Sequence, residues 1–162
     1  VLKNIAAHAD NFAGVLRELA EQADEQRMFI VAHSMGCIVT RQALLESRPE
    51  KLARVIFLCP PNRGSHVASR VAPLFGWFSA TLKEICDHPD SWVNRLPATL
   101  PSHVPVGIVV AKGDLVVAAE CTQLPGVEHV CLIGGMHAGI LAKAETARAV
   151  IHFLREGHFP AT

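Results

Sequence analysis

The sequence lacks an excess of charge of either sign, because 15 Lys and Arg balance 15 Asp and Glu among its 162 residues. A balanced chain in which half of the residues are apolar argues against a disordered tail and against a nucleic-acid partner. No apolar run reaches the roughly 18 residues that a membrane-spanning helix needs. We therefore expect a soluble single domain over residues 1–162, without stable membrane insertion.

The sequence also lacks a cysteine framework. Its 5 cysteines are an odd number with no C-x-x-C spacing, so neither a set of disulfides nor a thiolate zinc site is indicated. The histidines and carboxylates show no H-x-x-x-H or related helical spacing, so we expect no metal and no cofactor. Free thiols favour a reducing compartment, such as the cytoplasm, over secretion.

Hydrophobic periodicity predicts that helices and strands alternate along the chain. Apolar residues recur at every third or fourth position over 2–23, which indicates an amphipathic helix. Residues 28–33 are uniformly apolar, which suits a parallel strand covered on both faces. Further elements are a helix over 35–46, strands at 55–58, 106–111 and 127–133, and a helix over 140–156. The last helix is expected to end at Gly157 and to carry Ala144, Ala147, Ile151 and Leu154 on one face. The pattern predicts an α/β fold, a sheet of at least four parallel strands flanked by helices.

Residues 62–103 break this rhythm, because they are rich in glycine, proline and aromatic residues. We interpret them as a small cap inserted in the domain, with room for short helices around 67–74 and 77–85. Within the cap, Trp77, Phe78 and Leu74 would offer an apolar wall to an acyl chain. Packing inside a loop-rich segment explains such side chains equally well.

The segment Ala32-His33-Ser34-Met35-Gly36 indicates a nucleophile elbow between the first predicted strand and the helix after it. Serine is a weak nucleophile, and a sharp strand-to-helix turn lifts its hydroxyl to where a base can reach it. Ala32 and Gly36 are the small residues that relieve crowding in that turn. We predict that Ser34 is the nucleophile and that the Met35 amide, at the start of a helix, is one donor of the oxyanion hole. A buried strand whose ending matches the motif by chance is the alternative.

The order serine, acid, histidine is completed downstream. Asp114 follows the strand at 106–111, and His137 follows the strand at 127–133. Both should therefore lie with Ser34 at the carboxyl edge of the sheet. We predict that His137 is the general base and that Asp114 orients its imidazole.

Other choices stay open at this point. Glu120, Asp87 or Asp90 could supply the acid, and Asp114 would then be a solvated turn residue. The histidine of the last loop could merely pack there or cap the final helix. His33 adjoins the serine but is expected to point elsewhere in the elbow.

These residues resemble the α/β-hydrolase superfamily, and within it the bacterial lipase-like esterases. The resemblance also rests on the PPNRGS segment at 60–65 and on the ending at 153–159, and it extends over nearly the whole chain. It implies a catalytic triad and an oxyanion donor formed by Ser34, Asp114, His137 and Met35.

Two departures from such relatives bear on function. Relatives of this kind carry several strands and a His-Gly loop before the elbow, and the second oxyanion donor normally comes from that loop. This chain starts near the helix that precedes the elbow, and Ala32 replaces the usual glycine. The chain is therefore either a reduced hydrolase or a piece of a longer protein. The elbow strand would border a bare sheet edge, so we expect a homo-oligomer that covers this edge.

The function that joins these features is hydrolysis of short to medium acyl esters through an acyl-enzyme, with a small-molecule ester as the partner. An acyltransferase or a thioesterase would use the same triad and differ in acceptor or acyl donor. A non-catalytic binding module on a hydrolase fold is the alternative from another class.

Overall fold

The structure is a computed structural model that describes residues 4–22, 26–64, 92–97, 99–100 and 104–161. Its elements in chain order are α1 (Ile5–Gln22), β1 (Met28–His33), α2 (Met35–Glu46), β2 (Leu52–Leu58), α5 (Trp92–Arg95), β3 (Val106–Ala111), the 3-10 helix η1 (Ala119–Thr122), β4 (His129–Ile133), the 3-10 helix η2 (Gly139–Ala142) and α6 (Ala144–Glu156). The predicted alternation of helices and strands is confirmed.

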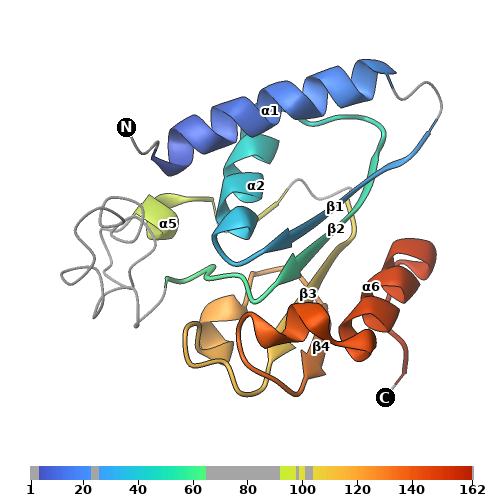
Figure 1. The fold of residues 1–162 in the computed structure, drawn as a ribbon. Helices are drawn as coiled ribbons and strands as arrows, with labels where there is room; N and C mark the ends of the chain where they lie inside the picture. The colour runs from blue at the N-terminus through green and yellow to red at the C-terminus, as the bar shows by residue number, and fades with distance from the viewer. Residues whose placement is uncertain (1–3, 23–25, 65–91, 98, 101–103, 162) are drawn as a thin grey trace.

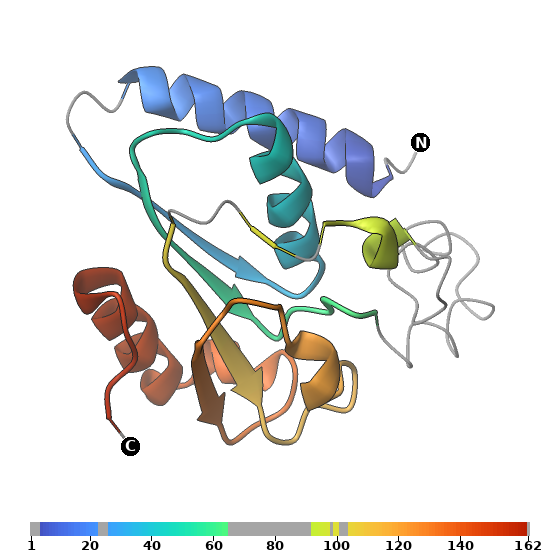
Figure 2. The same ribbon diagram turned by 180° about the vertical axis from the view of Figure 1, so that it is seen from behind.

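The four strands form one parallel sheet in the order β1-β2-β3-β4. Each strand pairs with its neighbour in sequence, so β1 and β4 are the edge strands of this sheet. Helices α1 and α2 cover one face and α6 covers the other, as Figure 1 and the reverse view in Figure 2 show. Because all four strands run the same way, the loops after them meet at one edge of the sheet.

The core has two layers, since successive strand residues point to opposite faces of the sheet. Ile30, Phe57 and Ile108 pack in the layer beneath α1 and α2. Ile56 and Val109 pack in the layer that α6 closes.

The closing helix differs from its prediction in its start and in its buried face. Residues predicted as its first turn form η2, and an extended Lys143 separates η2 from α6. The predicted apolar face is not the buried one, because Ile151 is 49 % exposed. The residues that α6 buries are Thr146, Ala149 and Phe153. Both sets of residues have helical spacing, so periodicity alone does not choose between them. The predicted end is confirmed, with Gly157 at φ 86°.

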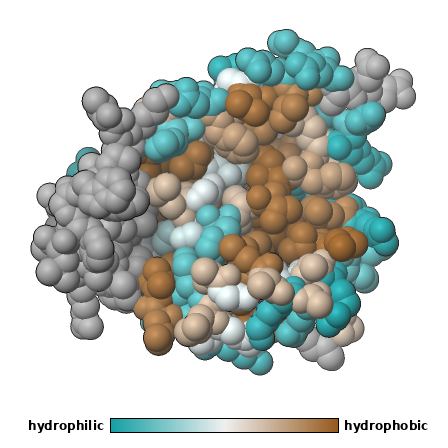
Figure 3. Space-filling view, in the orientation of Figure 1, coloured by the Kyte–Doolittle hydropathy of each residue, from teal (hydrophilic) through white to brown (hydrophobic). Residues whose placement is uncertain are grey.

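Strand β1 is parallel, as predicted, but it is covered on one face only. Phe29 and Val31 are 43 % and 46 % exposed, and we call this pair the open face of β1. Figure 3 shows apolar surface in the region between α1 and α6. The predicted cover on both faces is wrong because β1 is an edge strand beyond the reach of α6. No helix in the described ranges has the length and apolarity needed to cross a bilayer.

Candidate active site

Ser34 occupies the turn between β1 and α2 in a strained backbone conformation. Its φ of 54° and ψ of −126° lie where residues other than glycine are seldom found. The Ser34 amide donates to the Leu58 carbonyl at 2.9 Å, and the Cys37 amide donates to the Ser34 carbonyl at 3.0 Å. These bonds hold the sharp strand-to-helix turn that the sequence predicts.

The two small residues of the elbow lie opposite each other. A Cβ added to Gly36 would lie 4.0 Å from the Cβ of Ala32, which is an ordinary contact distance. The methyl group of Ala32 therefore fits where relatives carry glycine. Met35 is the first residue of α2, so its amide lies at a helix N-terminus, where backbone N–H groups attract negative charge.

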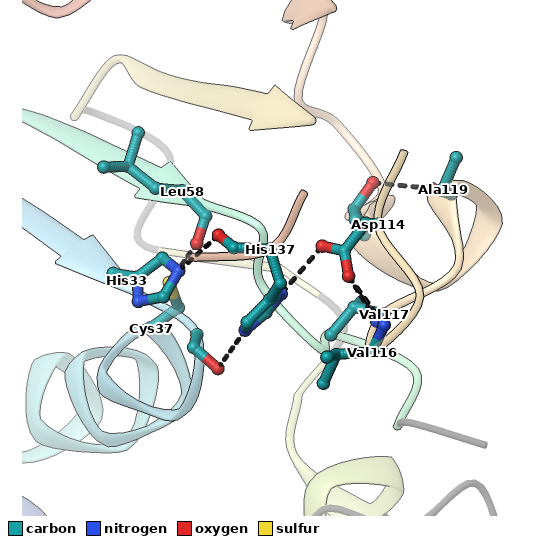
Figure 4. Close-up of polar contacts among 10 residues, drawn as sticks. His33, Cys37, Leu58, Asp114, Val116, Val117, Ala119 and His137 are labelled. Carbon is teal, nitrogen blue, oxygen red and sulfur yellow. Dashed lines mark hydrogen bonds and ion pairs between the residues drawn. The ribbon is translucent and has the colours of Figure 1, made fainter. Parts of the chain in front are cut away.

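Ser34, His137 and Asp114 form one hydrogen-bonded chain, two links of which are the dashed lines at His137 in Figure 4. Nε2 of His137 lies 2.8 Å from Oγ of Ser34. Nδ1 of His137 lies 2.7 Å from Oδ2 of Asp114. The three side chains come from the ends of β1, β3 and β4, which meet because the strands are parallel. The structure thus brings together the three residues singled out in the sequence.

Asp114 is held as a carboxylate by its own loop. Its Oδ1 accepts hydrogen bonds from the amides of Val116 and Val117 at 2.8 and 2.9 Å. Burial alone would raise the pKa of Asp114, but the amide bonds and His137 outweigh burial and lower the pKa. The side chains of His137 and Asp114 are 14 % and 2 % exposed. An ionised Asp114 favours the proton on Nδ1 of His137, which leaves Nε2 as the acceptor of a hydrogen bond from the Ser34 hydroxyl.

The expectation that His33 points elsewhere is wrong. Its Nε2 lies 3.1 Å from the carbonyl oxygen of His137, and the two ring centroids are 4.8 Å apart. Side-chain alternation along β1 places His33 on the same face as Val31, but it does not show that the loop after β4 reaches that face.

Cys59 is a second residue beside the triad that the sequence analysis did not single out. It follows β2 with a φ of 48°, and Asp114 is one of the groups that shift the pKa of its thiol. Burial, together with this neighbour, raises the pKa of the Cys59 thiol to about 12, so the thiol stays protonated. The register of β1 and β2 explains its position, because His33 pairs with Leu58, and Ser34 and Cys59 are the residues that follow this pair.

His33, Cys59 and His137 each place one potential metal-ligand atom within 4.8 Å of the other two. The expectation of no metal rested on spacing within a helix, and these residues come from three different strands. Both ring nitrogens of His137 are already in hydrogen bonds, to Ser34 and Asp114. A metal on His137 would break one of those bonds, so the arrangement suits proton transfer better than metal ligation.

Asn62, within the PPNRGS segment, links two loops that border the site. Buried Arg41 of α2 donates to Oδ1 of Asn62 at 3.2 Å, and Nδ2 of Asn62 donates to the Thr122 carbonyl at 2.7 Å. Burial lowers the pKa of Arg41 to about 10, so its guanidinium stays charged at neutral pH. This buried network connects the helix after the serine to the 3-10 helix after the aspartate.

Comparison with known protein families finds a match to this sequence. The family described as serine aminopeptidase, S33, matches residues 1–122, which include the elbow and Asp114. The chain belongs to the serine aminopeptidase S33 family. Among curated proteins, none matches this S33-family chain.

Solved structures share the fold of this S33-family chain. Phospholipase PlaB from Legionella pneumophila, in complex with thio-NAD, is 17 % identical with a TM-score of 0.73, over 93 % of this chain and 45 % of that chain. A Bacillus licheniformis lipase in its propeptide form is 16 % identical with a TM-score of 0.74, over 99 % of this chain and 42 % of that chain. A thermophilic esterase from Thermogutta terrifontis is 17 % identical with a TM-score of 0.62, over 98 % of this chain and 74 % of that chain. These likenesses confirm the α/β-hydrolase fold, and the chain spans less than half of the first two proteins.

Several residues weighed in the sequence are not brought together with the triad. Trp77, Phe78 and Leu74, the predicted acyl wall, lie outside the described residues, as does most of the cap predicted over 62–103. Asp87 and Asp90 lie outside them too. Glu120 is an exposed residue of η1, whereas Asp114 contacts His137 directly.

Proposed function

We propose that this S33-family α/β-hydrolase is a serine hydrolase of carboxylic esters. Oγ of Ser34 attacks the ester carbonyl carbon while Nε2 of His137 takes the hydroxyl proton. His137 then returns that proton to the leaving alkoxide, and the ester C–O bond breaks to leave an acyl-Ser34. Water, deprotonated by the same nitrogen, then attacks the acyl carbon. The bond between that carbon and Oγ of Ser34 breaks, and His137 returns the proton to Oγ, which releases the acid and free Ser34. Asp114 stabilises the imidazolium form of His137 in both halves of the cycle.

The observation that carries this proposal is the continuous chain of two short hydrogen bonds on a strained serine. The bonds of 2.8 and 2.7 Å give His137 one acceptor nitrogen toward Ser34 and one protonated nitrogen toward Asp114. A structural serine would gain nothing from a φ of 54°, which costs of order 1–3 kcal/mol. The amide of Met35 supports the same reading, because it lies next to the nucleophile at a helix N-terminus.

The direct test is hydrolysis of p-nitrophenyl butyrate by the wild-type chain and by Ser34→Ala. We expect Ser34→Ala to lower kcat/KM by roughly 10³-fold or more, because the nucleophile is lost. Circular dichroism of both proteins controls for folding. Equal rates for the two folded proteins would contradict the enzymatic proposal and favour a binding module on a hydrolase fold.

The family name favours a second candidate, hydrolysis of a peptide bond. The same residues could act, with His137 giving its proton to a leaving amine instead of an alkoxide. An aminoacyl p-nitroanilide assayed beside the ester separates the two activities. A higher kcat/KM for the anilide would replace the ester proposal by a peptidase one.

The acyl donor and acceptor are further parts of the proposal. Short to medium acyl esters stay our choice of substrate, with the predicted cap residues as the acyl wall. A thioesterase would cleave a thioester donor with the same triad, and an acyltransferase would pass the acyl group to an alcohol or amine instead of water. Product analysis with added alcohol distinguishes transfer from hydrolysis.

We also propose that copies of the chain associate through β1. Among the described strands, β1 pairs only with β2, so its outer backbone groups have no strand partner there. The open face of β1 adds exposed apolar surface next to that edge. An apolar strand edge of this kind favours association with another copy.

A further inference from the structure

The loop that carries His137 reaches across the carboxyl edge of the whole sheet. It leaves β4 at one edge, and His137 contacts His33 at the end of β1, the opposite edge. Three of its six residues at 134–139 are glycines, which gain more conformational freedom than other residues when they are not held. A loop of this composition needs outside contacts to keep an imidazole in place.

The base of this loop is fixed by the neighbouring strand ending. The Lys112 amide donates to the Ile133 carbonyl at 2.8 Å, and the Gly113 amide donates to the Gly135 carbonyl at 2.9 Å. These bonds end two residues before His137. Farther along, the Ile140 amide donates back to the Met136 carbonyl at 3.2 Å, a bond within the loop region itself.

The tip of the loop is held from the other side of the sheet. Nε2 of His33 lies 3.1 Å from the carbonyl oxygen of His137, the backbone of the same residue whose side chain bonds Ser34 and Asp114. A carbonyl oxygen only accepts, so Nε2 of His33 carries the donated proton. Figure 4 shows the His33 ring directed at this carbonyl from the end of β1.

We propose that His33 is a positioning residue, whose Nε2–H holds the backbone of the catalytic histidine so that Nε2 of His137 stays within reach of Ser34. This inference rests on the proposed hydrolase function. The residue before the nucleophile thereby ties the β1 end of the site to the loop from β4. The end of β1 then helps to position both residues of the proton-transfer pair. Ser34 follows it directly, and His137 is hydrogen-bonded to its last residue, His33.

The electrostatics of His33 agree with this role. Burial lowers the pKa of His33, and this effect outweighs the bond to the His137 carbonyl, which favours the charged form. A neutral His33 still donates from Nε2. The ring centroids of His33 and His137 are 4.8 Å apart. A neutral His33 therefore adds no positive charge beside His137 when His137 takes the proton of Ser34.

Three substitutions of His33 distinguish a role as hydrogen-bond donor to the His137 carbonyl from a role in packing against the His137 ring. His33→Gln retains an amide N–H at a similar distance from the main chain, and His33→Asn places that N–H one methylene farther from the carbonyl. His33→Phe keeps a ring beside His137 and removes the donor. A role in packing alone predicts that Phe is tolerated best, whereas the positioning role predicts that Gln is.

The experiment measures kcat and KM for p-nitrophenyl butyrate in these variants, after thermal unfolding has shown which of them are folded. We expect His33→Phe and His33→Asn to lower kcat by about 10- to 100-fold with KM changed by less than about threefold, since misplacement of a catalytic group by about 1 Å costs this much. His33→Gln should stay within about threefold of wild type. Equal kcat in the Gln and Asn variants, or wild-type kcat in His33→Phe or in His33→Asn, would overturn the proposal.

A second readout needs no substrate. The proton NMR signal of the Nδ1–H of His137, hydrogen-bonded to Asp114, reports how firmly the imidazole is held. We expect a sharp signal in the wild type and in His33→Gln, and a signal broadened by exchange in His33→Asn. A wild type that is inactive on esters but shows this difference would remove the ester proposal and keep the positioning role. The same sharp signal in all folded variants would remove the positioning role.

Discussion

At the residue scale, the site depends on two strained backbones held by their neighbours. Ser34 and Cys59 follow adjacent strands with φ values of 54° and 48°, and the Ser34 hydroxyl lies 2.8 Å from Nε2 of His137. Such conformations cost of order 1–3 kcal/mol each and persist only where surrounding bonds determine them. The backbone bonds from Ser34 to Leu58 and from Cys59 to Val109 supply that support.

Asp114 gives a pH-dependent prediction at the same scale. Its folded-state pKa is lowered, so its contribution to stability is fully present above the unfolded-state pKa of about 3.9 and is lost as pH falls through the folded-state value. Asp114→Asn removes this titration and keeps an oxygen for the Val116 and Val117 amides. In urea titrations, the free energy of unfolding lost in Asp114→Asn should shrink as the pH falls below about 4. A loss that is the same at pH 3 and pH 7 would show that the carboxylate is not stabilised in the fold.

The triad residues could be predicted because their signals are local in the sequence. Ser34 has a strand before it and a helix after it, and Asp114 and His137 each follow an apolar strand. His33 and Cys59 could not be found in this way, because their contacts depend on strand register and on where the β4 loop arrives. A histidine beside a serine carries no signal in its own neighbours that it will touch a loop 104 positions away.

At the scale of the elements, Gly107 shows why α6 sits where it does. A Cβ added to Gly107 of β3 would lie 2.9 Å from ring atoms of both Phe153 and Phe159. The ring centroids of those two residues are 4.9 Å apart, so the pair covers the strand as a unit. Gly107 in β3 therefore leaves the room in which Phe153, on the buried face of α6, packs against the sheet. Periodicity within the helix could not reveal this, since Gly107 is on another element.

Gly107→Ala should lower the free energy of unfolding by roughly 1–3 kcal/mol, because the new methyl group overlaps both rings. Phe159→Leu, which makes space above β3, should recover part of this loss when the two substitutions are combined. Chemical denaturation of the two single variants and the double variant measures the coupling between the sites. Strictly additive losses would place the strain somewhere other than this contact.

At the scale of the whole molecule, β1 is an edge strand of the sheet that the described residues form. The open face of β1, Phe29 and Val31, lies beside an edge with no strand partner in the described part of the chain. The sequence predicted the bare edge from the resemblance to longer hydrolases, yet it also predicted cover on both faces of β1. The exposed Phe29 and Val31 contradict the second expectation, because a uniformly apolar strand does not reveal whether a helix reaches it. Association through the edge stays a proposal.

The proposed association through this edge has a direct test. Light scattering at micromolar concentration should give a mass above that of one chain, since two copies can pair β1 with β1 about a two-fold axis. Val31→Lys should lower this mass, because a lysine there places a charge in the contact. Leu132→Lys is the matched control at the opposite edge, where Leu132 is 57 % exposed, and it should leave the mass unchanged. A wild-type monomer, or equal effects of both lysines, would count against association through β1.

The account as a whole depends on Ser34 being an activated nucleophile, and labelling by a fluorophosphonate tests this most directly. Trypsin cleaves after Arg27 and Arg41, which yields a peptide whose single serine is Ser34. Mass spectrometry should find the label on Ser34 in the wild type, with labelling slowed by about 10²-fold or more in His137→Ala, since the base activates the hydroxyl. A label on another residue, or equal labelling rates in wild type and His137→Ala, would contradict the account.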